Sequence, residues 1–530
     1  MKNQPSGLKA WLFTTDHKKI GIMYLGTAMV FLVVGLLLAI LMRTSLLSPE
    51  NPILGPKLYN VAFTIHGAGL ILFWMIPVLT GFFANYLIPL MIGARDVAFP
   101  RLNALSYWFY AGAGIVAVLA LLLGLDVGWY GYPPYSISEG VNTSLYVFVV
   151  LLLGLSGTAG AVNFITTIIT LRAPGMTWLR LNLFVWGALG AFIIQLIALP
   201  LLGAAVIFLF LDKYLGTSFY NVATGGNPVL YQHLFWFYGH PAVYVVALPI
   251  FGIVSEIITT FAKKRVFGYV SMVIALMAIT VIGFETWIHH LYTSGVVDWA
   301  RTLFMWATIL IAVPTGIKIF NWLGTLHKGS IEFRTPMLCA LGFISLFTIG
   351  GVTGVANGLL GFDIHVHDTQ WIPAHFHYVL SLSMTMLALG GIYYWFPKVT
   401  GRMYNEKLAK TGFWITIVGA MFAFFPQFIM GVEGLPRRYW SYPPEYQPMM
   451  IFSSITSYIA IAGFFLMIYN LVHSAIKGEK AVANPWGAKS LEWQIPSPPP
   501  AYNFEKIPVV TAGPYEFGKK ESVAASGQAT

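Results

Sequence analysis

Apolar residues dominate the chain in long uninterrupted stretches, and polar residues gather in the short segments between them. An α-helix needs about 20 predominantly apolar residues to cross the roughly 30 Å hydrocarbon core of a bilayer. A scan for stretches of that length predicts twelve membrane-spanning helices, with cores near 20–42, 60–91, 105–125, 143–170, 183–210, 229–260, 267–285, 287–320, 335–357, 369–395, 411–430 and 450–472. The pattern therefore predicts an all-α, polytopic membrane protein. The seventh and eighth helices have the least defined limits, because ionisable residues interrupt the hydrophobic signal there.

Composition supports this interpretation. Of the 530 residues, 57% are apolar and only 9% are charged, whereas ordinary soluble domains carry about 25% charged residues. A soluble protein and a disordered chain are both excluded. The single cysteine, Cys339, also excludes an intrachain disulfide framework.

The positive charges indicate an orientation. If the N-terminus lies inside the cell, the inside segments hold 23 Lys and Arg residues and the outside segments hold 6. The positive-inside rule then predicts that both termini are cytoplasmic. The net charge of +10 is thereby explained as a topology signal, and no nucleic-acid partner is expected.

Three regions follow from the pattern. Residues 1–19 form a cytoplasmic N-terminus without a cleavable signal, so that the first helix acts as a signal anchor. Residues 20–477 form a twelve-helix catalytic domain within the membrane, and residues 478–530 form a Pro-containing cytoplasmic tail. The tail contains IPSPPP and ends in VAASGQAT, which predicts an extended surface segment with a frayed end.

Histidines within the spans carry the chemical signal, because ionisable groups in a bilayer are costly and by default mark function. His375 and His377 are two residues apart, which on a helix places their rings on opposite faces, so that one helix can ligate two metals. His240 and Tyr244 are four apart and share a face. Imidazole suits copper and iron. The six intramembrane histidines that we single out are His66, His240, His289, His290, His375 and His377.

The motifs around these histidines resemble those of one family, subunit I of the haem–copper oxygen reductases, the cytochrome c oxidase family. They occur in order from TTDHKKIG near the N-terminus to GLPRRYW before the last span, and include TIHG, NYLIPLMIGARDVAFPRLN, QHLFWFYGHPAVY, WIHHLYTSG, PTGIKIFNWL and HVHDTQWIPAHFHYVLS. The resemblance implies the twelve-helix fold of that subunit and a location in the inner (plasma) membrane.

By this resemblance, His66 and His377 would be the axial ligands of a low-spin haem. His375 would ligate a high-spin haem. The copper B ligands would be His240, His289 and His290. Tyr244 would be joined covalently to His240 and would supply an electron and a proton for cleavage of the O–O bond.

The resemblance also assigns charged residues outside this centre. Arg43 matches an arginine near a substituent of the low-spin haem, and Arg437 and Arg438 match a pair that binds haem propionates. His367 and Asp368 resemble Mg²⁺ ligands, although a water-linked propionate network without a metal is the alternative.

Two proton pathways are implied as well. One matches the family's K-pathway and consists of Lys318, Thr315, Ser255 and Tyr244. The other matches the entrance of the D-pathway and consists of Asp96, Asn85, Asn103 and Asn163. A lysine in the middle of a span has no explanation as a snorkelling end residue, whereas Asp96 alone could be an interfacial carboxylate.

The chain departs from the usual family pattern at the D-pathway's inner end. Most relatives have Glu in GHPEVY, where this chain has Ala242, and a subclass has a Tyr-Ser pair where this chain has Tyr238 and Gly239. We expect Tyr238 and Glu285 together to replace the missing carboxylate. The expectation for Glu285 rests on its burial and on its place four residues before His289, on nearly the same helix face.

The function implied is a terminal oxidase that reduces O₂ to water with electrons from cytochrome c and translocates protons. Expected cofactors are two haems of a and a3 type, with b or o type as the alternative, copper B and Mg²⁺, with a dinuclear copper on subunit II. Expected partners are subunits II and III, cytochrome c, O₂ and the lipid bilayer.

Three alternatives remain open. A quinol oxidase of the family would carry polar pairs where this chain has Val34, Leu38, Leu58 and Val61. Nitric oxide reductases lack the tyrosine found here at position 244. A transporter or channel could also have twelve spans, but it would not need imidazoles on opposite faces of one helix.

Overall fold

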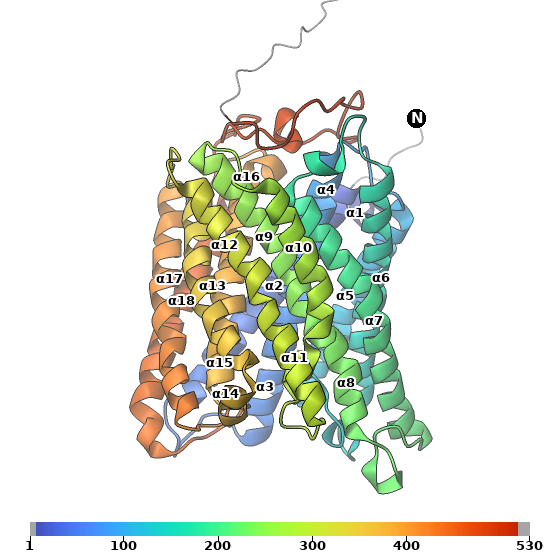
Figure 1. Ribbon diagram of the computed structural model, residues 1–530, viewed down its shortest axis with the longest axis vertical. Coiled ribbons are helices and arrows are strands. Elements are labelled where there is room, and N and C mark those ends of the chain that lie inside the picture. The colour runs from blue at the N-terminus through green and yellow to red at the C-terminus, as the bar shows by residue number, and fades with distance from the viewer. Residues whose placement is uncertain (1–6, 518–530) are drawn as a thin grey trace, which may run out of the picture.

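The fold is a bundle of long, roughly parallel helices, seen in a computed structural model that describes residues 7–517 (Figure 1). Twelve helical segments are long and apolar enough to cross a membrane, which confirms the predicted number. In chain order they are His17–Ser45, Pro56–Ile92, Pro100–Leu122, Thr143–Thr170, Leu183–Leu215, Pro228–Ala262, Tyr269–Leu291, Asp298–Leu326, Thr335–Gly358, Trp371–Thr400, Glu406–Val432 and Pro444–Lys477. Within the described range the chain forms no β-strand, only two isolated bridges.

Six of these spans are essentially single α-helices: α2 (His17–Ser45), α5 (Pro100–Leu122), α6 (Thr143–Thr170), α7 (Leu183–Leu215), α13 (Thr335–Gly358) and α17 (Glu406–Val432). A seventh is α18 (Gln447–Lys477), preceded by the short turn η9 (Pro444–Tyr446). Short helices outside the spans are α1 (Lys9–Leu12), α14 (Leu360–Val366), η3 (Tyr135–Ile137), η4 (Trp178–Arg180), η5 (Val222–Thr224) and η10 (Leu491–Gln494).

The remaining five spans change helix type or break along their length. The second comprises α3 (Pro56–Ala68), η1 (Gly69–Met75), η2 (Pro77–Phe83) and α4 (Ala84–Ile92). The sixth comprises α8 (Pro228–Gly239) and α9 (Pro241–Ala262), the seventh α10 (Tyr269–Ile282), η6 (Gly283–Glu285) and η7 (Trp287–Leu291), and the eighth α11 (Asp298–Leu310) and α12 (Ala312–Leu326). The tenth comprises α15 (Trp371–Phe376), η8 (His377–Met384) and α16 (Thr385–Thr400).

The irregular stretches coincide with the histidines singled out from the sequence. His377 begins the π-helical segment η8, His66 lies just before the π-helical segment η1, and His240 lies between α8 and α9. The break at His240 has a local cause, because Pro241 has no N–H to donate to the preceding turn. Departures from regular α-helix are frequent at functional sites.

The seventh and eighth spans differ from the sequence prediction. The predicted boundary at 285–287 is wrong, since the seventh span continues to Leu291 and the eighth begins only at Asp298. His289 and His290 therefore end one span in the 3₁₀ helix η7 instead of opening the next. The hydrophobic signal placed the break at the polar residues, whereas in the structure His289 and His290 belong to the seventh span and face the interior.

Small residues allow the central helices to approach closely. Gly187 of α7 lies against the Leu248 carbonyl of α9, and Gly252 of α9 lies against the Phe184 backbone of α7. A Cβ at either glycine would overlap the partner's backbone. Such contacts are typical of membrane helices, which gain stability from close van der Waals packing. They hold α7 and α9 together next to the histidine-bearing segments.

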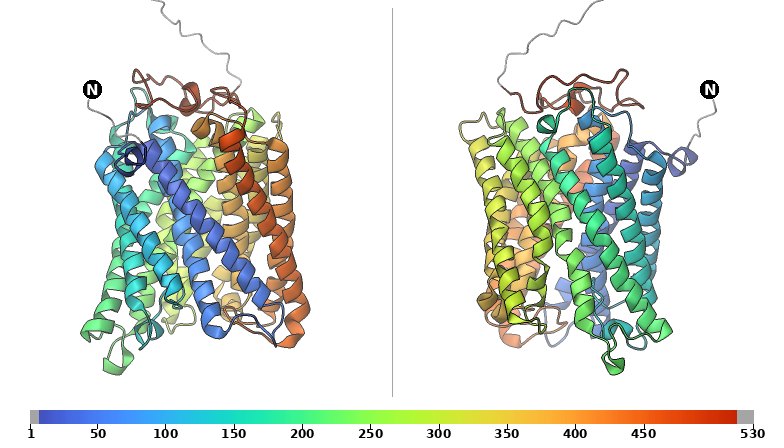
Figure 2. Two further views of the ribbon diagram at one scale, coloured as in Figure 1. Left: turned by 180° about the vertical axis from the view of Figure 1, so that it is seen from behind. Right: turned by 45° about the vertical axis from the view of Figure 1, so that its right-hand side comes forward.

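The C-terminal tail lies across one end of the bundle, on the same side as α1 (Figures 1 and 2). Even numbers of crossings bring both ends of a chain to one side, as the orientation argument requires. The tail is not simply an extended surface segment, and that part of the prediction is wrong: Trp486, Trp493 and Asn503 are buried. Lys398 donates to the Ile495 and Pro496 carbonyls of the tail. The sequence VAASGQAT lies outside the described residues.

Candidate functional site

Three histidines from two spans converge in the interior. His240 Nδ1 lies 3.2 Å from His290 Nε2, and His289 Nε2 lies 3.1 Å from His290 Nε2. Three ring nitrogens, one from each histidine, all lie within 4.8 Å of one another. Within residues 7–517 this is the one group of three or more His, Cys, Asp or Glu side chains with such geometry. Three neutral nitrogen donors in this arrangement fit a copper ion.

Neighbouring groups orient these rings. The indole of Trp236 stacks on His290 with ring centroids 3.6 Å apart and planes 8° apart. Thr308 Oγ1 lies 3.0 Å from His289 Nδ1, which leaves Nε2 for the centre of the cluster. Such contacts fix the ring orientation of metal-binding histidines. They indicate a preformed site.

Tyr244 lies beside His240, as their four-residue spacing predicts. Their ring centroids are 4.9 Å apart and their planes are 62° apart. The tyrosine fits because Gly283 has no side chain: a Cβ there would lie 2.8 Å from Tyr244 Cδ2. The buried Nε2 of His240 has no hydrogen-bond partner among the described residues. This nitrogen is the free valence that the expected covalent link to Tyr244 would need.

His66 of the second span and His377 of the tenth span face each other inside the bundle. Their rings are 6.4 Å apart between centroids and 20° from parallel. The Nδ1 atom of His66 lies 2.9 Å from the Gly35 carbonyl oxygen, and that of His377 lies 2.7 Å from the Pro373 carbonyl oxygen. With Nδ1–H donating to a carbonyl, Nε2 is left as a lone-pair donor. The pair fits an iron held between two imidazoles.

His375 is held separately, against α13. Its Nδ1 atom lies 3.0 Å from the Gly350 carbonyl oxygen and 3.1 Å from Thr353 Oγ1. A Cβ on Gly354 would lie 2.9 Å from His375 Cε1, so the ring fits only over a glycine. His375 and His377 therefore contact different helices, as their two-residue spacing predicts, and His375 also offers a free Nε2.

Arginines surround the His66–His377 pair and the nearby loop. Arg43 lies over the ring of Phe424, which itself stacks on His377. With the Gln427 amide turned so that both its ends are satisfied, its oxygen accepts from Arg43 Nη1 at 3.2 Å. Arg438 lies over Tyr130, with 4.4 Å between the guanidinium carbon and the ring centroid. Burial lowers the pKa of Arg438 to about 10, so it remains cationic at neutral pH.

The expected Mg²⁺ ligands are both engaged with other side chains. Arg437 Nε donates to Asp368 Oδ1 at 2.7 Å, and His367 Nδ1 lies 2.6 Å from Asp363 Oδ2. Although burial works to raise it, Arg437 and Arg438 hold the pKa of Asp368 below its usual value. Burial raises the pKa of Asp363. Asp363 was not among the predicted site residues, although its four-residue spacing from His367 is a helical signal.

Lys318 is fully buried, with 0% of its surface exposed. Its Nζ atom has no hydrogen-bond partner among the described residues and lies 5.1 Å from the centroid of the Phe251 ring. Ser255 accepts a 3.0 Å hydrogen bond from Trp322 Nε1. Thr315 stands one turn before Lys318 on α12 and donates to the Ile311 carbonyl. The residues occupy neighbouring helices, α9 and α12, in the cytoplasm-facing half of the predicted topology.

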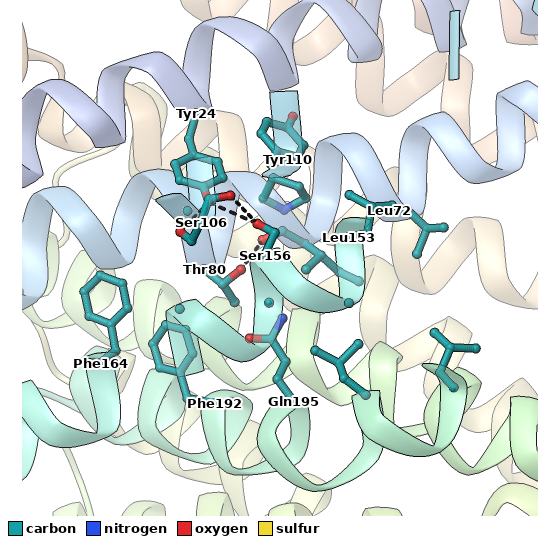
Figure 3. Close-up of a pocket in the computed structure, with 18 of the residues that line it drawn as sticks. Tyr24, Leu72, Thr80, Ser106, Tyr110, Leu153, Ser156, Phe164, Phe192 and Gln195 are labelled. Atoms are coloured by element: carbon teal, nitrogen blue, oxygen red, sulfur yellow. Dashed lines mark hydrogen bonds between the residues drawn. The ribbon is translucent and has the colours of Figure 1, made fainter. Parts of the chain in front are cut away.

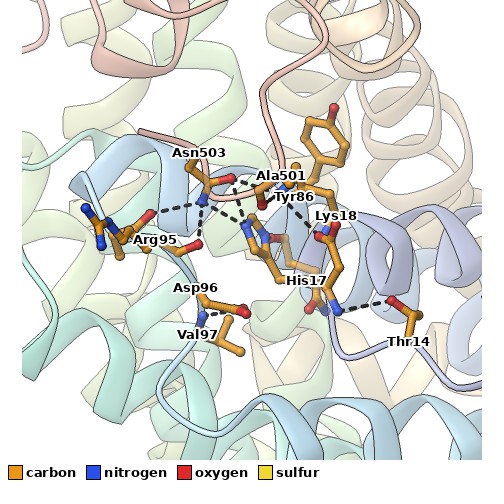
Figure 4. A network of polar contacts seen from close by, with 12 residues as sticks. Thr14, His17, Lys18, Tyr86, Arg95, Asp96, Val97, Ala501 and Asn503 are labelled. Carbon is orange, nitrogen blue, oxygen red and sulfur yellow. Dashed lines mark hydrogen bonds and ion pairs between the residues drawn. The ribbon is translucent and has the colours of Figure 1, made fainter. Parts of the chain in front are cut away.

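Asp96 lies in the loop between α4 and α5, beneath the C-terminal tail (Figure 4). Burial raises the pKa of its carboxyl to about 6. Asn503 of the tail reaches the same region and donates from Nδ2 to the Ala94 carbonyl at 2.9 Å. Its Oδ1 atom accepts from Lys18 Nζ, also at 2.9 Å. Asn503 was not among the predicted site residues, since nothing in the tail's composition indicates a buried contact.

The three asparagines expected near Asp96 form a buried polar group. Asn103 Nδ2 donates to Asn85 Oδ1 at 2.6 Å, and Asn163 Oδ1 accepts from the Phe99 amide at 2.8 Å. All three side chains are buried. Beyond them Tyr238 is also buried, one turn from the apolar Ala242.

Glu285 does not fit the role that the sequence suggested. It is exposed on the outer face of the bundle, so the premise of a buried carboxylate is wrong. The four-residue spacing to His289 does not place them on one face, because the segment passes through two separate 3₁₀ turns, η6 and η7, instead of a continuous α-helix. The Tyr-Ser pair of the other subclass has no room here either, because a Cβ on Gly239 would lie 2.7 Å from Trp236 Cε3.

Comparisons with known proteins agree with this geometry. Residues 19–459 match the family model described as cytochrome c and quinol oxidase polypeptide I. The chain is 44% identical to cytochrome c oxidase subunit 1 of Thermostichus vulcanus over 522 residues, covering 97% of this chain and 95% of that protein. It is 46% identical to the same subunit of Synechocystis over 508 residues, covering 96% and 92%.

A more distant relative shares the fold. The solved structure of a haem–copper terminal oxidase dimer superposes with a TM-score of 0.78 at 19% identity, covering 88% of this chain and 85% of that one. Cytochrome c oxidase subunit 1 of Cereibacter sphaeroides is 43% identical over 536 residues, covering 94% and 95%. The chain belongs to the cytochrome c and quinol oxidase polypeptide I family and is a haem–copper terminal oxidase catalytic subunit of the membrane.

Proposed function

We propose that this subunit reduces O₂ to water with four electrons from cytochrome c and couples the reaction to proton translocation. The observation that carries the proposal is the convergence of His240, His289 and His290, with ligand atoms within 4.8 Å of one another, beside Tyr244. When bound, the two haems and copper B that the family implies would supply electron transfer and O₂ reduction.

The histidines would hold these groups in three places. His66 and His377 would hold the low-spin haem iron, since both offer Nε2 from nearly parallel rings. His375 would hold the high-spin haem iron through the nitrogen that Thr353 and Gly350 leave free. Copper B would be held by the three-histidine cluster. Arg43, Arg437 and Arg438 would neutralise haem substituents, and their positive charge favours anionic propionates.

Protons would reach the centre along two routes from the cytoplasmic side. Lys318, with Thr315 and Ser255, would lead to the Tyr244 hydroxyl, which gives a proton to the reaction. Asp96 would take up protons at the other entrance, and Asn85, Asn103 and Asn163 would lead them inward toward Tyr238. A buried amine without a hydrogen-bond partner is hard to explain as packing.

Cytochrome c is favoured over quinol as the electron source. Quinol oxidases of the family carry polar pairs at four positions that are apolar in this chain, namely Val34, Leu38, Leu58 and Val61. Electrons would then enter through a dinuclear copper on subunit II. The proposal includes a and a3 haems, Mg²⁺ near His367 and Asp368, subunits II and III, and a plasma-membrane location with both termini cytoplasmic.

The test is to purify the complex from the membrane and measure its spectrum, metals and oxygen consumption. We expect reduced-minus-oxidised bands of two haems, bound copper, and O₂ consumption with reduced cytochrome c exceeding that with a quinol. Faster turnover with quinol would show that the protein is a quinol oxidase instead. A colourless protein would contradict every haem-based function.

The matched variant is His290→Asn. It should lose copper and O₂ consumption while the band of the low-spin haem persists, because His66 and His377 are untouched. If copper remains bound at the wild-type level, the three-histidine cluster is not the copper site.

A further inference from the structure

A cavity lies between the asparagine group near Asp96 and Tyr238. Its volume is about 60 Å³, and it is lined by helices of the second to sixth spans together with α2. Its polar lining includes Asn85 at one end, Ser106 and Ser156 on one wall, and Gln195 and Tyr238. Figure 3 shows Gln195 reaching into this space from α7, across from the two serines.

The serine wall is a closed hydrogen-bonded cluster. Tyr24 Oη lies 2.8 Å from Ser106 Oγ and 3.2 Å from Ser156 Oγ. Ser156 donates to the Ser106 carbonyl, and Ser106 donates to the Asn103 carbonyl. Since Asn103 donates in turn to Asn85, a continuous chain of polar groups runs from the asparagines to Ser156.

The other polar side chains of the lining are also engaged. Thr80 donates to the Ile76 carbonyl at 2.9 Å, and Tyr110 donates to the Phe73 carbonyl at 2.7 Å. Both hydroxyls therefore donate to the protein backbone. Neither donates to a group between Ser156 and Tyr238.

Gln195 differs from these residues. Only 2% of it is exposed, yet its Oε1 atom has no hydrogen-bond partner among the described residues. A buried amide without partners is unfavourable. A Cβ on Gly157 would lie 3.4 Å from Gln195 Nε2, so the amide is held against α6 by packing alone. A cavity of about 60 Å³ has room for ordered water, which satisfies polar groups of this kind.

Tyr238 shares this property. It is 4% exposed, lines the same cavity, and its hydroxyl forms no hydrogen bond with the described residues. Its neighbour one turn along, Ala242, has no polar atom. Gln195 and Tyr238 are thus the two lining side chains whose polar ends are left for the cavity's contents.

We propose that Gln195 is a positioning residue that orders water between Ser156 and the Tyr238 hydroxyl, in the oxidase of the proposed function. Its amide accepts through Oε1 and donates through Nε2, so it orders water on both sides. Each water takes a proton from the serine side and releases another toward Tyr238. No bond to Gln195 forms and no electron moves, because the amide is not ionised.

The test compares Gln195→Leu with Gln195→Glu and with Leu202→Met in the complete oxidase. Leu has nearly the size of Gln but no hydrogen-bonding group. A protonated Glu donates and accepts as the amide does, and Leu202 lines the same cavity two turns along α7. Each variant is measured for haem spectrum, turnover, protons released per electron in vesicles, and the solvent isotope effect on turnover.

We expect Gln195→Leu to keep the haem spectrum, to lose about tenfold in turnover, to release fewer protons per electron and to show a larger isotope effect. Gln195→Glu should recover most of the turnover, and Leu202→Met should match the wild type. A purely structural role would not change the isotope effect. If Gln195→Leu fails to assemble, Gln195→Met is measured in its place.

Wild-type proton release and turnover in Gln195→Leu would overturn this inference while leaving the oxidase function intact. The same holds if Leu202→Met shows the same losses, since the effect would then be one of packing. By contrast, a wild-type complex that consumes no O₂ would overturn the proposed function itself.

Discussion

The imidazole rings of His66 and His377 lie 20° from parallel with their centroids 6.4 Å apart, although 311 positions separate the two residues in the chain. Each ring is anchored at Nδ1 by a backbone carbonyl from a different segment, Gly35 for one and Pro373 for the other. This arrangement presents both Nε2 atoms to one space, and within residues 7–517 no side chain forms a hydrogen bond with either of them.

The two haem positions should be separable by mutation. His377→Ala is expected to remove the absorption of the low-spin haem and to lower turnover by more than about 100-fold. His375→Ala should also abolish turnover but leave the low-spin band, because it contacts α13 and not His66. Optical spectra of the purified variants check both. Loss of the low-spin band in His375→Ala would contradict the assignment.

Gly354 should be required by the ring of His375. Gly354→Ala places a Cβ 2.9 Å from His375 Cε1, which forces the imidazole to move and should perturb the high-spin haem and lower turnover. The matched control is Gly351→Ala on the same helix, where a Cβ meets no atom within 4 Å. Equal spectra and rates for the two variants would show that the ring has room to shift.

Lys318→Met should change stability and activity in opposite directions. Removing a fully buried polar group that lacks a hydrogen-bond partner among the described residues is expected to stabilise the fold by about 1–3 kcal/mol. Turnover should fall by about 100-fold or more, since a proton-transfer group is lost. Thermal unfolding in detergent and O₂ consumption measure the two effects.

The control for this variant is Lys57→Met, because Lys57 is exposed. It should alter neither quantity. A less stable Lys318→Met protein would mean that the amine has a stabilising partner, and an unchanged turnover would remove Lys318 from the proton route.

Asp96 should make stability depend on pH. Burial raises its pKa from 3.8 to about 6 in the folded protein, so between these pH values the folded state binds a proton that the unfolded state has released. Stability is therefore lost as pH rises through this window. Asp96→Asn removes this slope, and its melting temperature should gain on that of the wild type from pH 4 to pH 6. A constant difference in melting temperature would refute the raised pKa.

Much of the site was accessible from the sequence because it depends on local spacing. The four-residue spacing of His240 and Tyr244 and the two-residue spacing of His375 and His377 fix relative directions within one turn of helix. The structure agrees with both. The twelve spans were predictable for the same kind of reason, since the length of an apolar stretch needs no knowledge of its neighbours.

Prediction from residue spacing failed where the backbone departs from regular α-helical geometry. Glu285 and His289 are four apart, but they belong to two separate 3₁₀ turns, η6 and η7, and Glu285 is exposed. No residue pattern in WIHHLYTSG predicts this change of helix type. The tail failed for a related reason, because burial of Trp486 and Asn503 depends on the shape of the bundle end that receives them.

By itself, the sequence determined the membrane-spanning architecture, the family and the ligand types, because hydrophobic length and local residue spacing carry that information along the chain. Only the tertiary structure decided which groups are left without hydrogen-bond partners in residues 7–517, among them Lys318 Nζ, His240 Nε2 and Gln195 Oε1. Whether a polar atom is satisfied depends on every element packed around it. That information is spread over residues far apart in the chain and becomes definite only when the helices have packed.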